Sequence, residues 1–440
     1  MESQNMITRF EIPSHAGSGS IRRMASQCST PWTLVHTRDT DFEWVPYGLE
    51  RMLQVASDNG SVMIYSDHFN DGAPAPVIDC QEGGILRDDF DFGGVQIFRT
   101  DALRQAASQM TEDYLYAGLY DLRLKASRLG PVTHVPEFLY YETDGDKRSS
   151  GERLFDYVNP RARAVQLEME AACTDHLRAV GALLRPDEYK DIDLSGGEFA
   201  YEASVVIPCR NRVRTISDAI RSALGQKTDF PYNVIVVDDN STDGTVEKIL
   251  EFASDPRLVY IPQPPVWHGI GGNWNAALHH PLCGRFALQL DSDDVYSGPD
   301  TVQRFVDAFR SQNCAMVIGT YRITDFNLRE LPPGVIDHRE WTPDNGRNNA
   351  LRINGLGAPR GFFTPLLRSI NFPPTKYGED YAVALRISRE WRIGRIYDVM
   401  YCCRRWEDNS DAALSVEKTN ENNLYKDRIR SWELQARKRR

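Results

Sequence analysis

The chain has 440 residues, of which 41% are hydrophobic and 26% are charged, and its formal net charge is −11. This length and composition predict a globular protein of two or three domains. No run reaches the roughly 18 apolar residues of a membrane span, the first residues lack the layout of a secretory signal, and the acidic balance argues against nucleic-acid binding. Because the eight cysteines are scattered without a CxxC pair, we expect them to be reduced in a cytoplasmic protein.

The first 200 residues predict three segments without clear chemistry. Residues 1–30 are polar and include GSGS, which favours a flexible arm. Residues 31–155 alternate apolar runs with amphipathic stretches, which indicates an α/β domain. Residues 156–200 contain a long charged helix with apolar side chains along one side, and we expect a helical linker there. Within the second segment we expect strands at residues 33–38, 62–69 and 95–100 and helices at residues 47–57, 102–110 and 114–127.

Residues 201–415 show the clearest pattern. Buried strands alternate with helices, and the strands are expected at residues 203–208, 233–239, 258–262 and 286–290. This alternation predicts βαβ units and a parallel sheet whose strands end at one common edge. Ligands bind at that edge in such sheets. Four polar groups are expected there, at residues 208–212, 238–243, 269–275 and 291–294.

Two of these groups suit a nucleotide. The carboxylates of Asp238 and Asp239 match the donor groups of a base or a ribose, while Ser241 and Thr242 beside them also suit a helix cap. Backbone amides near the glycines that open the third helix suit an anion. The spacing of these glycines does not match G-x-G-x-x-G, so a dehydrogenase is not expected.

The stretch RFALQLDSDD ends an apolar strand in three carboxylates, Asp291, Asp293 and Asp294. Acids this close repel one another unless a cation or hydrogen-bond donors compensate. Asp-x-Asp offers two oxygen ligands to a Mg²⁺ or Mn²⁺ ion that a diphosphate also holds. The open alternative is an acidic turn that caps the helix expected at residues 301–309.

Five motifs in order carry a resemblance to a known family: VVIPCRN, VVDDNSTDGT, GNWNAA, LDSDD and YGEDYAVALR. Residues 203 to about 415, half of the chain, resemble family 2 glycosyltransferases of the GT-A fold. The resemblance implies a Rossmann-like α/β domain for nucleotide-diphospho-sugar transfer, with a mixed, mainly parallel sheet. It also implies an inverting transfer to an acceptor hydroxyl in glycan or polysaccharide synthesis, with Mn²⁺ or Mg²⁺ held by Asp291 and Asp293.

The same resemblance makes Asp380, preceded by Glu379, the candidate general base. Displacing a nucleoside diphosphate needs a metal to neutralise the leaving group and a carboxylate to take the acceptor's proton. The alternative is a pair of helix-start acids that interact favourably with the helix dipole. The candidate residues for nucleotide-sugar binding are Pro208, Arg210, Asn211, Asp238, Asp239, Asn275, Asp291, Arg404 and Arg405.

The chain departs from the family pattern at two places. Many relatives have Arg before the Asn of the third-helix motif and, after the Glu-Asp helix, a His that helps to bind the metal. This chain has Trp274 at the first place and Arg404, Arg405 and Trp406 near the second. The two arginines suit diphosphate oxygens, and Trp406 and Glu407 are the candidates to replace the histidine.

The N-terminal half contains an internal repeat. WVPYGLERMLQ parallels SGPDTVQRFVDAF, and MTEDYLYAGLY parallels KYGEDYAVALR. Residues 31–155 therefore predict a degenerate half GT-A-like domain, with residues 112–113 in the place of 379–380 and residues 37–39 near the place of the aspartates. Too few residues precede it for a nucleotide-binding half, so we expect it to position the acceptor or to mediate assembly rather than to catalyse.

Residues 416–440 predict a basic C-terminal helix. A solvated helix end is favoured there over contact with the inner face of a membrane. The expected partners are a nucleotide-diphosphate sugar and a glycan or lipid-linked acceptor. A non-catalytic nucleotide-sugar or glycan-binding protein stays open as an alternative, while a nucleotidyltransferase is disfavoured because CRNRV is not a Gly-rich basic loop.

Overall fold

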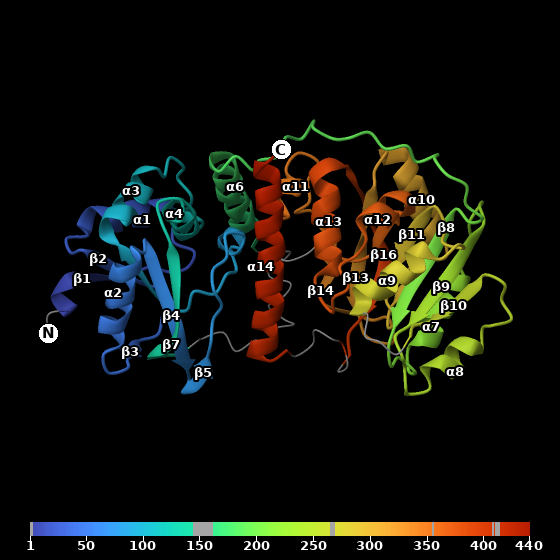
Figure 1. Cartoon of the computed structure of the whole chain (residues 1–440), viewed down its shortest axis with the longest axis horizontal. Helices are drawn as coiled ribbons and strands as arrows, with labels where there is room; N and C mark the ends of the chain where they lie inside the picture. Colours follow the sequence, from blue (N-terminus) through green and yellow to red (C-terminus); the bar gives the residue numbers. More distant parts are fainter. Residues whose placement is uncertain (1–2, 144–161, 265–268, 354–355, 407–408, 410–413) are drawn as a thin grey trace. The chain divides into compact units, whose positions relative to one another are not determined.

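The computed structural model describes residues 3–143, 162–264, 269–353, 356–406, 409 and 414–440. Two compact units, each built around one sheet, divide the chain differently from the expected domains (Figure 1). Unit 2 contains Leu184–Ala350 and Gly355–Ala412, and unit 1 contains Met1–Leu183, Leu351–Asn354 and Ala413–Arg440. Unit 1 is therefore assembled from three separate segments of the chain.

The sheet of unit 2 is nine-stranded and mixed, which confirms the expected α/β class. Its parallel part runs in the order β10-β9-β8-β11. Beyond β11 the pairs are antiparallel except for the parallel pair β13–β16. The strands are β8 (Ala203–Cys209), β9 (Tyr232–Asp238), β10 (Leu258–Pro262), β11 (Phe286–Gln289), β12 (Val295–Tyr296), β13 (Met316–Thr324), β14 (Glu330–Ile336), β15 (Arg360–Phe363) and β16 (Ile393–Arg404). The helices are α7 (Ile216–Leu224), α8 (Thr245–Leu250), α9 (Gly269–His279), α10 (Thr301–Gln312), α11 (Gly346–Asn349), α12 (Thr364–Ile370) and α13 (Glu379–Glu390).

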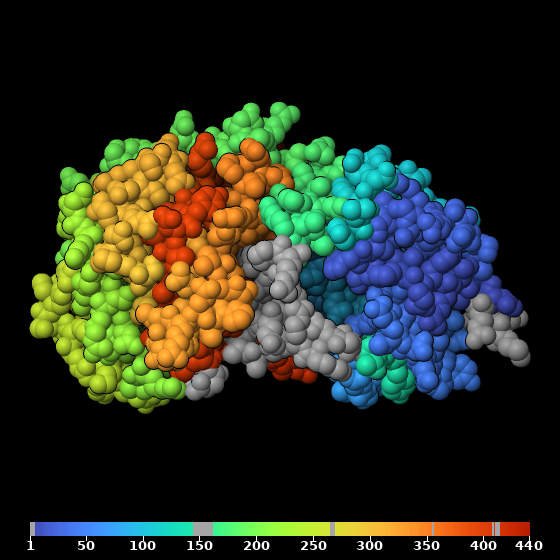
Figure 2. Space-filling model, turned by 180° about the vertical axis from the view of Figure 1, so that it is seen from behind, coloured from blue at the N-terminus to red at the C-terminus, as the bar shows by residue number. Residues whose placement is uncertain are grey.

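The central strands of unit 2 are buried along their whole length. Every residue of β8, β9 and β11 is buried, and helices α7, α9 and α10 pack on these strands. Apolar β-branched runs are typical of parallel strands covered in this way. Segments far apart in the sequence thus form one continuous surface of the unit, as the adjoining green, yellow and orange parts of Figure 2 show. The parallel pairing brings the ends of β8, β9 and β11 to one edge, as predicted.

The sheet of unit 1 has seven strands in the order β1-β2-β6-β4-β7-β3, with β5 on β4. Its strands are β1 (Ile7–Glu11), β2 (Trp32–His36), β3 (Phe42–Trp44), β4 (Met63–Asn70), β5 (Ala73–Ala75), β6 (Val95–Arg99) and β7 (Val132–Glu142). Its helices are α1 (Ser18–Gln27), α2 (Gly48–Asn59), α3 (Thr100–Ser108), α4 (Gly118–Ala126), α6 (Arg163–Ala179) and α14 (Val416–Lys438), with the short 3₁₀ helices η1 (Ser3–Met6) and η2 (Gly84–Leu86).

Within the expected flexible arm at residues 1–30, the described residues 3–30 form ordered structure instead. Strand β1 pairs in parallel with β2, and α1 buries Ile21, Met24 and Ala25. The prediction was wrong because β1 is a five-residue edge strand in which no residue is fully buried, and an edge strand needs no continuous apolar run.

Two helices expected outside the N-terminal domain also belong to unit 1. The charged helix α6 was expected in a linker, but it buries Met169, Cys173 and Leu177. The helix α14 buries several of the basic residues that suggested a solvated or membrane-facing end, namely Lys426, Arg430 and Arg437. In the described part of the chain, no helix is long and apolar enough to cross a membrane.

The two sheets pair their strands in the same order and with the same directions. The path β1-β2-β6-β4-β7-β3 corresponds to β8-β11-β15-β13-β16-β12, and β5 corresponds to β14. Along each of these two paths the first and fourth pairs are parallel and the others are antiparallel, and β5 and β14 pair antiparallel with their neighbours. The long parallel pairs β4–β7 and β13–β16 also share an irregular register. In the described part of unit 1, no strand corresponds to β9 or β10.

Candidate active site

The loops that follow β8 and β9 lock each other in place. The Asn211 backbone N–H donates to Ser241 Oγ at 2.8 Å, and the Thr242 N–H donates to Asn211 Oδ1 at 2.8 Å. Asn211 has a positive φ of 51°, a conformation that Asn tolerates better than most residues. Pro208 lies inside β8, opposite Val237. The structure therefore gives Asn211 a loop-shaping role and buries Pro208, which leaves the side chains beyond them to meet a ligand.

The two acids after β9 differ in their surroundings. Asp238 accepts a hydrogen bond from the Ser241 N–H at 3.1 Å and from the Cys209 thiol at 3.7 Å, so it supports the loop. Asp239 is 4% exposed, and its Oδ1 has no partner among the described residues. Its Oδ2 lies 3.8 Å from Arg210 Nη1. An unpaired buried carboxylate oxygen is costly unless a ligand supplies a donor, so Asp239 is the better candidate for base recognition.

Gln263, which sequence reasoning missed, supplies the opposite polarity beside Asp239. Its backbone N–H donates to Asp238 O at 2.9 Å, which continues the β9–β10 pairing by one residue. Its side-chain Nε2 is buried without a partner in the described structure. A donor and an acceptor thus stand unused at the ends of neighbouring strands.

The carboxylates after β11 meet at the same edge. Asp291 accepts from Gln289 Nε2, 3.0 Å from each carboxylate oxygen, and from the Tyr401 hydroxyl at 3.0 Å. Asp294 is buried and accepts the backbone N–H of Arg404 at 2.7 Å. Burial raises the pKa of Asp291, and the negative charge of Asp293 adds to the rise. Burial and both neighbouring aspartates raise the pKa of Asp294 well above its usual range. The cluster is short of positive charge.

Asp293 faces three donors from two segments of the chain. Its Oδ2 lies 3.3 Å from both Trp406 Nε1 and Asn409 Nδ2, and 3.9 Å from Arg212 Nε. An indole nitrogen is a donor only, so Trp406 contacts the carboxylate and cannot replace the expected histidine as a metal ligand. Glu407, the other candidate, lies outside the described residues. Arg212 is a missed candidate that its place in CRNRV could have signalled.

Arg404 ends β16, and Arg405 follows it. Arg404 is buried, donates through Nε to the Asp293 carbonyl and pairs through Nη1 with Asp218 at 2.9 Å. Its Nη2 has no partner in the described structure. The Arg405 backbone N–H donates to Thr324 O at 2.8 Å. Arg404 therefore braces the acidic turn, while a contact of either arginine with a diphosphate stays a prediction.

Helix α13 presents the two acids of the expected base motif. Asp380 is paired with Arg360, with 2.5 Å between Asp380 Oδ2 and Arg360 Nη2, and its Oδ1 accepts the Tyr381 N–H at 2.6 Å. Burial raises the pKa of Glu379 to about 8, and the charge of Asp380 contributes. Glu379 is therefore mostly protonated at neutral pH, whereas Asp380 is held by the Arg360 guanidinium.

Asn275 does not reach the strand ends with its side chain. Its amide donates to Phe372 O and accepts from the Phe372 N–H, both at 2.8 Å. Helix α9 packs closely on this segment, since a Cβ at Gly271 would lie 1.9 Å from Pro373 O. Asn275 therefore clamps the segment that leads to α13, and its contact with the nucleotide stays a prediction.

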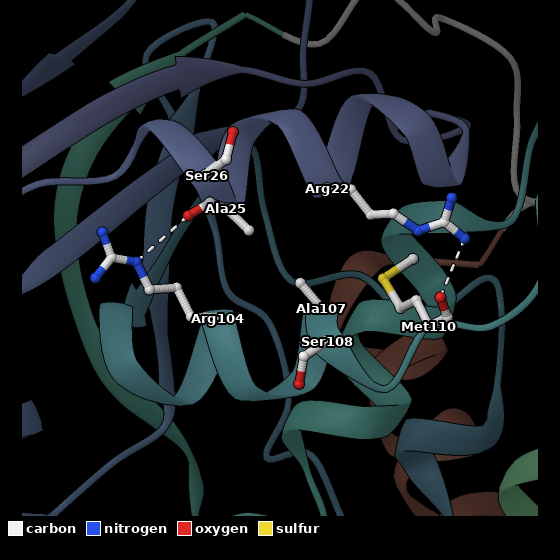
Figure 3. Close-up of a pocket in the computed structure, with 7 residues that line it drawn as sticks. All are labelled: Arg22, Ala25, Ser26, Arg104, Ala107, Ser108 and Met110. Carbon is white, nitrogen blue, oxygen red and sulfur yellow. Dashed lines mark hydrogen bonds between the residues drawn. The ribbon is translucent and has the colours of Figure 1, made fainter.

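A shallow hollow of about 350 Å³ lies in unit 1 between α1 and α3 (Figure 3). Its two arginines are already engaged, because Arg22 donates to Met110 O at 3.0 Å and Arg104 donates to Ala25 O at 3.4 Å. None of the predicted site residues lines it. The candidate site is therefore the strand edge of unit 2.

Comparisons with known proteins agree with this location. Residues 204–371 match the family model described as glycosyl transferase family 2. The chain is 28% identical over 238 residues to the Escherichia coli UDP-Glc:alpha-D-GlcNAc-diphosphoundecaprenol beta-1,3-glucosyltransferase WfgD. The matched region covers 53% of this chain and 85% of that protein. It is 26% identical to the poly(ribitol-phosphate) beta-glucosyltransferase of Bacillus spizizenii over 46% of this chain, and spans only 32% of that relative.

Solved structures give a weaker likeness. Residues 1–349 of Staphylococcus aureus TarS in complex with UDP-GlcNAc match at 24% identity and a TM-score of 0.41, covering 54% of this chain and 72% of that one. The mannosyltransferase PcManGT of Pyrobaculum calidifontis, with GDP-Man and Mn²⁺, matches at 16% identity and a TM-score of 0.37, covering 64% and 86%. At these scores, the fold assignment rests on the strand order and the family match.

Proposed function

Because residues 204–371 form a glycosyltransferase domain of family 2, we propose that the chain moves a sugar from a nucleotide-diphosphate sugar to an acceptor hydroxyl with inversion of the anomeric configuration. The observation that carries the proposal is the contact chain between the acidic cluster and Asp380. Arg360 holds Asp380 and also donates to Gln289 Oε1 at 3.1 Å, and Gln289 donates to Asp291. A candidate leaving-group site and a candidate base are thus joined within one network.

The unused polar atoms at Asp239 and Gln263 support a uracil base in the donor. Uracil presents one N–H beside carbonyl oxygens, which match one carboxylate oxygen and one amide N–H₂. The name of the Escherichia coli relative also specifies a UDP sugar.

The acidic cluster fits a divalent cation as cofactor. Three carboxylates lie within four residues, and burial together with the neighbouring aspartates raises the pKa values of Asp291 and Asp294. Asp291 and Asp293 would hold Mn²⁺ or Mg²⁺. In the described part of the chain, no set of three His, Cys, Asp or Glu side chains is arranged as a complete metal site. Two carboxylates suffice when the diphosphate supplies further oxygens, and the ion would neutralise the leaving diphosphate.

Asp380 is proposed to take the acceptor's proton. A single displacement needs one base at the acceptor hydroxyl, and the carboxylate of Asp380 is 27% exposed, whereas Glu379 is buried. The proton passes to a carboxylate oxygen of Asp380 as the hydroxyl oxygen bonds to the anomeric carbon and the bond to the diphosphate breaks. The acceptor is proposed to be a glycan or a lipid-linked glycan, as the relative's name suggests.

The proposed function is tested by incubating the full chain with UDP, GDP, dTDP and CMP sugars and with glycan or lipid-linked acceptors, with and without Mn²⁺ or Mg²⁺. Transfer from a UDP sugar that requires the ion is expected. Binding of nucleotide sugars without any transfer or hydrolysis would replace the proposal by a binding role. Transfer from another nucleotide sugar would overturn only the choice of base.

The metal prediction concerns Asp293. Asp293→Ala removes a proposed ligand and also relieves repulsion in the cluster, so we expect metal-dependent donor binding to be lost while the melting temperature is kept. The measurement is calorimetric titration with a UDP sugar at several Mn²⁺ concentrations. The exposed Asp187→Asn serves as the control. Unchanged metal-dependent binding in folded Asp293→Ala would refute the assignment.

We also propose that unit 1 is a partial second copy of the GT-A-like fold without catalysis. The shared strand order, shared directions and shared irregular register support duplication. In place of an acidic edge, Arg38 and His68 pair with buried Glu142 at 2.9 and 3.0 Å, and a Cβ at Gly94 would lie 2.1 Å from Glu142. Side chains of unit 1 therefore fill the place that corresponds to the acidic strand edge of unit 2.

The expected base motif of this copy is also out of place. Asp113 lies in the loop before α4, is 86% exposed and pairs with Arg22. Asp113→Asn is therefore expected to keep transfer at the wild-type rate in a steady-state assay. A collapse of turnover in a folded variant would show that unit 1 takes part in the chemistry.

A further inference from the structure

We propose that Arg360 and Gln289 are positioning residues that hold the base and the metal-binding carboxylate in register. This inference rests on the proposed function, and it concerns two residues that the sequence motifs do not include. Arg360 opens β15 and Gln289 ends β11, and these strands are antiparallel neighbours. Both side chains are polar in strands that are otherwise apolar. Burying a polar group costs free energy unless the group is hydrogen-bonded.

Each nitrogen of the Arg360 guanidinium contacts a different partner. Nε donates to Leu356 O at 2.5 Å, Nη1 donates to Gln289 Oε1 at 3.1 Å, and Nη2 pairs with Asp380 at 2.5 Å. The side chain is 12% exposed. A planar, always charged fork held at three points cannot rotate freely, so it fixes the direction from which it meets Asp380.

Gln289 continues the chain of contacts to the acidic cluster. Its Oε1 accepts from Arg360, and its Nε2 lies 3.0 Å from each oxygen of Asp291. An amide is suited to this place because it accepts on one side and donates on the other. A glutamate here would bring a fourth negative charge to the cluster, and an apolar residue would break the connection.

The connection has a consequence for the reaction. Asp291 would hold the metal and diphosphate and so place the anomeric carbon, and Asp380 would take the proton of the acceptor hydroxyl. The contacts that link Asp291, Gln289, Arg360 and Asp380 fix the donor site and the base relative to each other within one unit. A misplacement of about 1 Å can cost about 100-fold in rate, so a loosened chain should slow transfer and admit water in place of the acceptor.

Arg360→Lys tests the inference because lysine keeps the charge but has one donor centre, which cannot hold Gln289 and Asp380 in the same geometry. We expect kcat for transfer to fall about 10- to 100-fold, with the donor Kd changed by less than about threefold. The ratio of donor hydrolysis to transfer should rise. This ratio does not depend on how much protein is folded, so a merely structural role would not change it.

Gln289→Met is the second variant, since it keeps the side-chain length and removes both hydrogen bonds. It is expected to shift the ratio in the same direction as Arg360→Lys. The control is Arg310→Lys, which alters an Arg–Glu pair with Glu202, the residue just before β8 and so at the opposite end of the strand.

Wild-type transfer rates and ratios in Arg360→Lys or in Gln289→Met would overturn the inference while leaving the proposed function in place. A wild-type protein without transfer from any nucleotide sugar would instead overturn the proposed function itself.

Discussion

Replacing Asp380 with Asn is expected to lower kcat about 10²- to 10⁴-fold, because the amide keeps the size of the side chain but cannot accept the acceptor's proton. Donor affinity should hardly change, since Asp380 contacts Arg360 and the Tyr381 N–H rather than the acidic cluster. Single-turnover transfer and the donor's Kd are the two measurements. Together they separate the chemical step from binding.

A structural role for Asp380 predicts the opposite pattern. Loss of a helix-start acid costs about 0.5–2 kcal/mol of stability, and turnover per folded molecule would be preserved. Asp187→Asn again controls for the loss of one carboxylate at the surface of unit 2. Preserved single-turnover transfer with only a lowered melting temperature would reject the catalytic role.

Replacing Asp427 with Ala is expected to destabilise unit 1 by about 3–5 kcal/mol, the usual cost of removing one partner from a buried ion pair. Asp427 Oδ1 lies 3.0 Å from Arg87 Nε and 2.9 Å from Arg430 Nη1, and all three side chains are almost fully buried. The variant leaves two guanidinium groups in the interior without this carboxylate. Denaturant unfolding of the full chain, followed by circular dichroism, measures the loss.

The same helix offers a matched control. Glu421 pairs with Lys418 at 2.8 Å but is 69% exposed, so Glu421→Ala should cost no more than about 1 kcal/mol. Equal stability losses in the two variants would contradict the special role of the buried pair.

The sequence predicted the strand edge of unit 2 well because local patterns determine it. An apolar run followed by acids identifies the end of a buried strand, and parallel pairing brings such ends together. The acidic cluster and Asp239 were found in this way. Their positions depend on strand order and burial, which periodicity reveals.

The long side chains were harder to predict because their partners are distant in sequence. Arg404 follows a strand as a phosphate ligand would, yet it pairs with Asp218, which lies 186 positions earlier. Asn275 sits in the expected motif but binds Phe372, 97 positions later. Arg360 was missed because nothing near it in sequence marks it as the partner of Asp380. Rotamers and tertiary neighbours decide these contacts, and neither is visible in local spacing.

The nested order of the two units constrains how the chain can be made. Unit 2 lies between segments of unit 1 along the chain, and α14 with Asp427 is synthesised after all of unit 2. The carboxylate that compensates Arg87 therefore leaves the ribosome more than 300 residues after Arg87 itself. Domains usually fold as units during synthesis. Unit 2 can therefore reach its final structure first, whereas unit 1 can be completed only after α14 has been synthesised.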